Sequence, residues 1–196
     1  MFPKSNELEA YTCLVTGGSR GIGAAIARAV ASRGANVIIN YRSSELEALR
    51  LARDLREKGA GVLAIRADLS RENEVERMFT RIEAEIGYVN ALVYNAGISQ
   101  RGLLIESSEE QWDRVMNTNL KGAFLCCRRV LPYMIRERFG RIINIASVLG
   151  ISGASYESIY SSAKGGLIAL TRSLAQEVGP SGITVNAIAP GPIFTD

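Results

Sequence analysis

Short apolar runs alternate with helix-like segments along the whole sequence. Runs rich in Val and Ile predict six strands, at residues 11–15, 36–40, 62–66, 91–94, 141–146 and 184–189. The segments between them predict five helices, at residues 21–33, 44–58, 72–86, 109–138 and 158–178. Strands that alternate with helices form parallel sheets, because each crossover lays a helix on the sheet. We therefore expect an α/β fold, a doubly wound parallel sheet with helices on both faces.

The fourth predicted helix is long, and we expect Gly122 and Pro132 to bend or break it. The chain contains no linker-like stretch, internal repeat or low-complexity segment. We therefore expect one domain over residues 1–196.

A glycine-rich turn joins the first predicted strand to the first predicted helix. Glycine permits a tight turn that brings the backbone close to a phosphate, and the helix N-terminus adds unpaired N–H groups and a partial positive charge. The turn therefore predicts a site for a phosphorylated ligand. Its candidate residues are Gly17, Ser19, Arg20, Gly21, Ile22 and Gly23.

The tip of the second predicted strand indicates which nucleotide would bind. An acidic residue there favours NAD, whereas a basic residue accommodates the additional phosphate of NADP. Here Arg42 follows the strand and no acidic residue appears before Glu45. Arg20 can reach the same region, and two guanidiniums beside one phosphate favour NADP(H). The alternative is that Arg42 is a solvated turn residue.

Two further segments end at the same edge of the predicted sheet. Asp68 follows the third strand, where its carboxylate can accept a hydrogen bond from adenine or can cap the next helix, a role for which Ser70 competes. Small residues after the fourth strand allow a cofactor to lie close to the backbone. This adds five candidate cofactor residues: Asp68, Leu69, Asn95, Ala96 and Gly97.

The chain contains no histidine, which excludes Ser-His-Asp and Cys-His catalysis and removes a common zinc ligand. Cys13, Cys126 and Cys127 lack metal-type spacing, so we interpret them as buried thiols and expect no metal site. Acid–base chemistry must then come from Tyr, Lys, Cys, Asp or Glu.

Tyr160 and Lys164 lie four residues apart in the last predicted helix and therefore share a face. A lysine cation stabilises a phenolate and lowers the pKa of the tyrosine, which improves it as an acid–base catalyst. Ser147 ends the fifth strand, where its hydroxyl can hold a substrate carbonyl. Asn119 can anchor a water that carries protons to the lysine. The alternatives are a helix cap for Ser147 and an internal hydrogen bond for Asn119.

In this order, the motifs resemble the short-chain dehydrogenase/reductase family over essentially the whole chain. The resemblance implies a Rossmann-type sheet and a tetrad of Asn119, Ser147, Tyr160 and Lys164, with Tyr160 as the general acid in carbonyl reduction. It also implies that Lys164 binds the nicotinamide ribose. The segment that it places beside the nicotinamide contains Pro190, Gly191, Ile193 and Thr195.

Within that family, the chain is most similar to bacterial 3-oxoacyl-[acyl-carrier-protein] reductases. This implies a small-molecule or carrier-bound carbonyl substrate, a place in fatty acid biosynthesis and a homo-oligomer, either a tetramer or a dimer. Residues 153–157 are instead similar to a reductase that acts on a modification of elongation factor P. Sugar and alcohol dehydrogenases are further alternatives.

Two features depart from the family pattern. Tyr94 stands where the family usually has an asparagine, and we expect local repacking there without loss of activity. The sequence ends at Asp196, whereas family members usually continue with a substrate lid and a seventh strand. We therefore expect a truncated domain with an unpaired sixth strand. This motivates the alternative of a non-catalytic NADP-binding or scaffold protein.

Composition narrows the possible partners. The net charge is +3 and the basic residues are scattered, so we expect no nucleic-acid partner. No apolar run is long enough for a membrane span, and the N-terminus lacks the apolar core of a signal peptide. We therefore expect no membrane partner and a cytoplasmic location.

Overall fold

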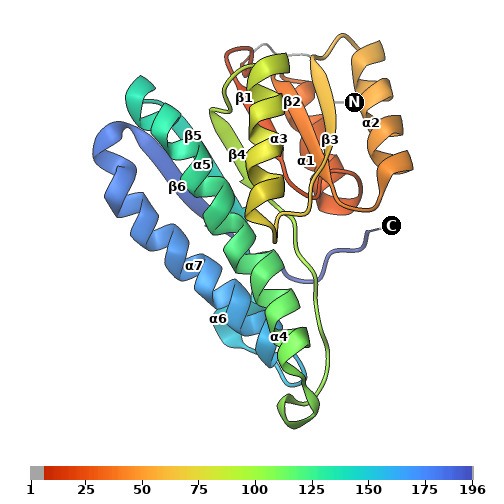
Figure 1. Ribbon diagram of the computed structural model, residues 1–196, viewed down its shortest axis with the longest axis vertical. Coiled ribbons are helices and arrows are strands. Elements are labelled where there is room, and N and C mark those ends of the chain that lie inside the picture. The colour runs from red at the N-terminus through yellow and green to blue at the C-terminus, as the bar shows by residue number, and fades with distance from the viewer. Residues whose placement is uncertain (1–6, 196) are drawn as a thin grey trace.

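Six parallel strands form one sheet in a computed structural model that describes residues 7–195 (Figure 1). Their order is β3-β2-β1-β4-β5-β6. The strands are β1 (Thr12–Val15), β2 (Asn36–Tyr41), β3 (Val62–Arg66), β4 (Ala91–Tyr94), β5 (Gly140–Ile145) and β6 (Ile183–Ile188). This confirms the predicted parallel sheet. The order reverses between β1 and β4, and in such sheets the crevice at the reversal is the usual ligand site.

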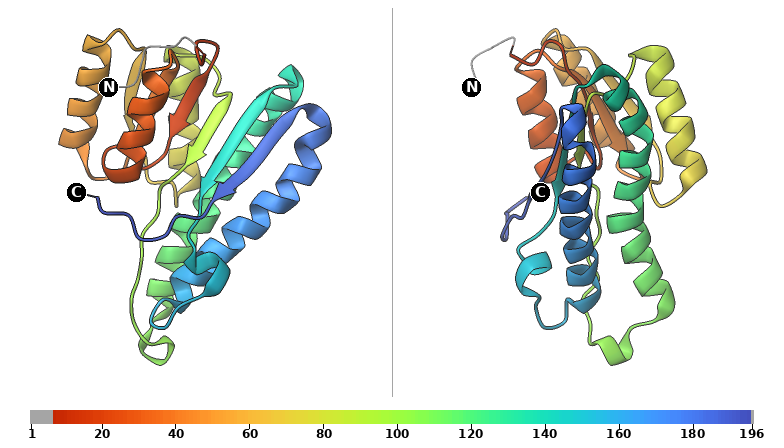
Figure 2. Two further views of the ribbon diagram at one scale, coloured as in Figure 1. Left: turned by 180° about the vertical axis from the view of Figure 1, so that it is seen from behind. Right: turned by 90° about the vertical axis from the view of Figure 1, so that its left-hand side faces the viewer.

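Helices cover both faces of the sheet (Figures 1 and 2). One face packs against α1 (Gly21–Ala31) and α2 (Glu45–Glu57), and the other against α3 (Glu72–Glu85), α5 (Gly122–Glu137) and α7 (Ser158–Val178). Successive strand residues point to opposite faces, so Leu14 joins one core cluster and Val15 the other. Both faces are therefore apolar, as the near-continuous Val and Ile runs predict. Within residues 7–195, no helix has the length and apolarity to cross a bilayer.

The segment predicted as one long helix is divided into three parts. They are α4 (Glu109–Met116), a π-helical turn (Asn117–Lys121) and α5. The helix changes character just before Gly122, and it does not end at Pro132, which lies inside α5. Three short elements were also not predicted: a 3₁₀ turn (Leu104–Glu106), α6 (Leu149–Ser152) and a second 3₁₀ turn (Gly179–Ser181).

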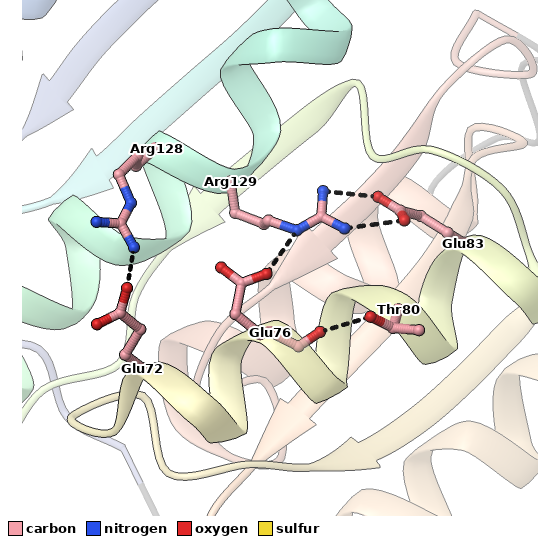
Figure 3. A network of polar contacts seen from close by, with 6 residues as sticks. All are labelled: Glu72, Glu76, Thr80, Glu83, Arg128 and Arg129. Atoms are coloured by element: carbon pink, nitrogen blue, oxygen red, sulfur yellow. Dashed lines mark hydrogen bonds and ion pairs between the residues drawn. The ribbon is translucent and has the colours of Figure 1, made fainter.

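Ion pairs join α3 to α5 along their outer sides (Figure 3). The Arg129 guanidinium contacts Glu83 at 2.8 Å and Glu76 at 3.1 Å, and Arg128 pairs with Glu72. The guanidinium of Arg129 also lies 5.5 Å from the centre of the Phe79 ring. These contacts fix α3 against α5 at the rim of the core.

After β6, the chain turns back across the carboxyl ends of the strands toward α1 (Figure 2). The amide of Val148 donates to the Pro190 carbonyl at 3.0 Å, which ties this tail to the end of β5. Farther along, the side chain of Thr195 lies against Gly21, at the start of α1. The tail therefore forms one border of the crevice.

Candidate active site

A cavity of about 670 Å³ opens at the carboxyl ends of the strands. The structure brings most of the predicted site residues into its lining, although they come from segments far apart in the sequence. These are Gly17, Ser19, Arg20, Gly21, Ile22, Arg42, Asp68, Leu69, Asn95, Ala96, Gly97, Ser147, Tyr160, Lys164, Pro190, Gly191, Ile193 and Thr195. Gly23 and Asn119 lie just behind this lining, against Gly17 and Gly97 respectively.

The glycine-rich turn offers a bare backbone to the cavity. Gly17 and Gly21 have φ of 58° and 52°, a conformation that favours glycine. Gly23 is needed for packing, because a Cβ there would lie 2.7 Å from the side-chain nitrogen of Asn95. In the described part of the chain, no side chain caps α1 at Arg20. The first amides of α1 can therefore meet a pyrophosphate, and the turn fits a dinucleotide.

Buried polar side chains hold this turn in shape. The Thr16 hydroxyl accepts hydrogen bonds from the amides of Asn95 (2.9 Å) and Ala96 (3.0 Å), and the Asn95 side chain donates to the carbonyls of Thr16 and Gly17 (3.1 Å each). Asn40 donates to the Ala67 carbonyl at 3.2 Å. We did not predict Thr16 or Asn40 as site residues. For Asn40, the available signal was a polar residue ending an otherwise apolar strand.

Two exposed guanidiniums, those of Arg20 and Arg42, line the part of the cavity near the tip of β2. The Arg66 side chain donates to the Arg42 carbonyl at 3.1 Å and thereby supports that turn. The nearby carboxylate of Glu45 accepts a hydrogen bond from the Tyr41 hydroxyl at 3.0 Å. The tip of β2 therefore presents positive charge and hydroxyl groups. The hydroxyl groups come from Ser43 and Ser44, which also line the cavity and were not predicted.

Asp68 faces the cavity but does not cap α3, whose N-cap residue is Arg71. Its carboxylate accepts two hydrogen bonds from Ser70, at 3.0 Å from the amide and 2.7 Å from the hydroxyl. Burial raises the pKa of Asp68, but the Ser70 hydrogen bonds and the charges of Arg42 and Arg71 outweigh it and leave the pKa below its ordinary value. Asp68 is therefore an ionised acceptor at neutral pH.

Tyr160 and Lys164 project from the first turns of α7 into the cavity. The Lys164 ammonium lies 5.8 Å from the centre of the Tyr160 ring and donates to the Ile145 carbonyl at 2.7 Å. Lys164 is 3% exposed, and this burial lowers its pKa to about 8. The hydrogen bond to Ile145 holds the Lys164 side chain near the phenol. Its pKa of about 8 allows it to gain and lose a proton close to neutral pH.

The pKa of Tyr160 is raised here, whereas we expected Lys164 to lower it. Burial is the main cause, hydrogen bonding with Ser147 acts in the opposite direction, and the charge of Glu157 adds to the increase. The Lys164 ammonium donates to the Ile145 carbonyl and is not among the groups that shift the Tyr160 pKa. Tyr160 is therefore protonated at neutral pH in this arrangement, so it holds the proton that a general acid gives.

Ser147 and Asn119 each combine a structural contact with a place beside the reacting groups. The Ser147 hydroxyl accepts from the Leu149 amide at 3.2 Å and also neighbours Tyr160, whereas the N-cap position of α6 is occupied by Val148. The Asn119 side chain bonds both backbone groups of Ile98, at 2.8 Å each. The alternative of an internal hydrogen bond is therefore realised for Asn119. A water beside it would bind the second N–H or the second lone pair of the side-chain amide.

Comparison with known proteins shows extensive similarity. A family model described as short chain dehydrogenase matches residues 11–196. The chain is 43% identical to the 3-oxoacyl-[acyl-carrier-protein] reductase FabG of Staphylococcus epidermidis over 185 residues, 94% of this chain and 76% of that protein. It is 40% identical to a 3-oxoacyl-[acyl-carrier-protein] reductase of Synechocystis over 96% of this chain and 76% of the relative. For a reductase of the same name from Bos taurus, the identity is 44% over 94% and 76%.

Proposed function

We propose a function on the premise that the chain belongs to the short-chain dehydrogenase/reductase family. In this proposal it is an NADP(H)-dependent enzyme that reduces the ketone of a 3-oxoacyl thioester to an alcohol. The thioester is carried by an acyl carrier protein or a small-molecule analogue of it. A cytoplasmic location, a homo-oligomeric assembly and a single domain over residues 1–196 belong to the same proposal.

One observation carries this proposal. The cavity joins a glycine-rich anion site at the start of α1 to a polar cluster of Ser147, Tyr160 and Lys164. A site that only bound a nucleotide would not need a buried lysine cation, because burying such a charge destabilises the fold. The chemistry of the cluster suits a substrate whose carbonyl oxygen gains a proton.

The protein's own groups divide the chemistry between them. NADPH, when bound, supplies a hydride to the carbonyl carbon. The phenol of Tyr160 gives its proton to the carbonyl oxygen, and the hydroxyl of Ser147 orients that oxygen. A water held at Asn119 carries a proton back toward the phenolate from Lys164, whose pKa of about 8 permits this transfer near neutral pH.

The choice of NADP(H) rests on charge at the tip of β2. Arg20 and Arg42 offer two guanidiniums to the additional phosphate of NADP. The carboxylate that would accept hydrogen bonds from the ribose of NAD is missing at this tip, where Arg42 follows Tyr41 and the first acidic residue is Glu45, in α2. Asp68 lies farther along the cavity and suits the adenine amino group.

The replacement Tyr160→Phe tests the mechanism. With acetoacetyl thioester substrates, we expect the wild-type protein to oxidise NADPH, followed by absorbance. We expect turnover by Tyr160→Phe to fall at least about 100-fold, the usual contribution of a general acid. NADPH binding, followed by fluorescence titration, should change little because the ring remains.

Tyr133→Phe is the matched control, because Tyr133 stacks on Tyr88 on the outer side of α5. It should keep full activity. Full activity of Tyr160→Phe would refute the mechanism. NADPH binding by the wild-type protein without oxidation by any 3-oxoacyl thioester, simple ketone or sugar would favour the scaffold alternative.

A further inference from the structure

Tyr94 makes an unusual contact at the end of β4. Its side chain is fully buried, and its hydroxyl donates a hydrogen bond to the backbone carbonyl of Thr118 at 2.5 Å. Thr118 belongs to the π-helical turn between α4 and α5 and lines the cavity. A side chain from the sheet therefore reaches into the irregular turn of a neighbouring helix.

The packing around this contact is tight. A Cβ on Gly122, the first residue of α5, would clash with the Tyr94 hydroxyl and would lie 3.1 Å from the Leu69 carbonyl. The phenol fits only because this helix position has no side chain. Burial also raises the pKa of Tyr94 well above its ordinary value, so the hydroxyl stays a donor throughout the pH range of an assay.

A second contact, made by the Asn119 side chain, joins the same two segments. Asn119 follows Thr118 in the π turn, and its side chain bonds both backbone groups of Ile98. Ile98 lies four residues after Tyr94 in the segment that borders the cavity. Covalent and hydrogen bonds thus form a closed ring. It runs along the chain from Tyr94 to Ile98, across to the Asn119 side chain, through the Thr118 peptide and back to the Tyr94 hydroxyl.

This ring lies beside the proposed reacting groups. A Cβ on Gly97 would lie 3.1 Å from the Asn119 side-chain oxygen and 3.4 Å from the Lys164 ammonium. A shift of the π turn would therefore move Asn119 relative to Lys164. A π turn interrupts the regular hydrogen-bond ladder of an α-helix, and such turns are frequent at functional sites.

We propose that Tyr94 is a positioning residue, whose hydroxyl holds the π turn at Thr118 and so fixes Asn119 beside Lys164. The inference rests on the proposed function, because it assigns the effect to the reductase site. It also gives the residue that departs from the family pattern a specific task. Tyr94 contacts neither substrate nor cofactor in this role.

Replacement Tyr94→Phe removes only the hydroxyl and leaves the buried ring in place. We expect kcat for the 3-oxoacyl thioester to fall about tenfold, because small displacements of a catalytic site are costly. The KM values for NADPH and thioester should change less than about twofold, since neither binding surface is altered. Tyr11→Phe, at the opposite end of β1 where the ring packs against Phe139, is the matched control and should retain wild-type kcat.

A double-mutant cycle separates positioning from general damage. Asn119→Ala should lower kcat, and Tyr94→Phe/Asn119→Ala should be no slower than Asn119→Ala alone, because Tyr94 acts through Asn119. Unfolding temperatures are measured for every variant and the assays are run well below the lowest of them. Unfolded protein then does not enter the comparison.

The possible failures are distinguishable. If Asn119→Ala is impaired but Tyr94→Phe keeps the wild-type kcat, the inference is wrong and the proposed function stands. If the two losses multiply in the double variant, Tyr94 acts independently of Asn119 and the inference is again wrong. If Asn119→Ala is fully active, Tyr94 has no catalytic group to position, so the inference is wrong and the proposed function stands. If the wild-type protein reduces no thioester, the proposed function fails and takes this inference with it.

Discussion

Lys164 is a cationic side chain placed almost entirely out of contact with water. Burial lowers its pKa from 10.5 to about 8, so folding disfavours its charged form. At about 1.36 kcal/mol per pKa unit, the penalty is about 3 kcal/mol below pH 8. It declines as the pH rises from about 8 to 10.5, where only the unfolded chain binds the proton, and it vanishes above that range. The hydrogen bond to the Ile145 carbonyl offsets about 1 kcal/mol of it.

We therefore expect Lys164→Met to increase the free energy of unfolding by about 1–2 kcal/mol at pH 7 while it abolishes reduction of the thioester. Urea unfolding at pH 7 and at pH 10 measures both variants under the same conditions. The advantage of the methionine variant should shrink at pH 10, because the wild-type lysine is then mostly neutral in the folded state. A methionine variant that is less stable at pH 7 would contradict this account.

The pairing of α3 with α5 is the clearest charge-based contact between two elements of the fold. Arg129 forms ion pairs with Glu76 and Glu83, and its guanidinium also contacts the Phe79 ring. Its side chain is 26% exposed. Arg128 pairs with Glu72 from a side chain that is 48% exposed (Figure 3). Ion pairs contribute little when water surrounds them, so the two neighbouring arginines should differ in their effect on stability.

We expect Arg129→Met to lower the free energy of unfolding by about 1 kcal/mol, and Arg128→Met to lower it by less than about 0.5 kcal/mol. Chemical denaturation of the two variants measures the difference. The loss for Arg129→Met should shrink at high salt, where the wild-type ion pairs are screened. Equal losses for the two arginines would show that exposure does not control these pairs.

Most elements were predictable because burial leaves a local pattern: a helix buries one face at helical spacing, and a strand of this sheet is a short run that is apolar on both faces. In α3, for example, Val75, Met78, Phe79 and Ile82 are buried at helical spacing. The π turn at Asn117–Lys121 was not predictable in this way, because its contacts to Tyr94 and Ile98 come from residues 21 to 24 positions away. Local periodicity carries no information about such partners.

The same distinction applies to the candidate site. The glycine-rich turn and the spacing of Tyr160 and Lys164 are local patterns, and the structure places both at one cavity. Thr16 and Asn40 act across 23 to 80 residues of sequence, so their importance emerges only once the strands are adjacent. The direction of the Tyr160 pKa was also mispredicted, because proximity in a helix does not show where the Lys164 ammonium points.

At the scale of the whole molecule, binding of the proposed cofactor would link segments from every part of the chain. The cavity is bordered by the turn after β1, the tip of β2, the segment after β4, the start of α7 and the tail after β6. A ligand that bridges these segments binds the folded chain and not the unfolded chain, so it stabilises the whole fold by mass action.

At 100 times its Kd, NADP⁺ should increase the free energy of unfolding by about 2.7 kcal/mol, which corresponds to a rise in Tm of about 5–10 °C for a chain of this length. NAD⁺ at the same concentration should produce a smaller rise, because it lacks the phosphate that Arg20 and Arg42 would hold.

Thermal melts of wild type and Arg42→Asp measure the gap in Tm rise between NADP⁺ and NAD⁺. This gap should shrink or reverse in the variant. Arg50→Asp, an equal charge change at an exposed position on α2, should leave the gap unchanged. Equal shifts by the two cofactors in the wild-type protein would show that the guanidiniums at the tip of β2 do not read the additional phosphate.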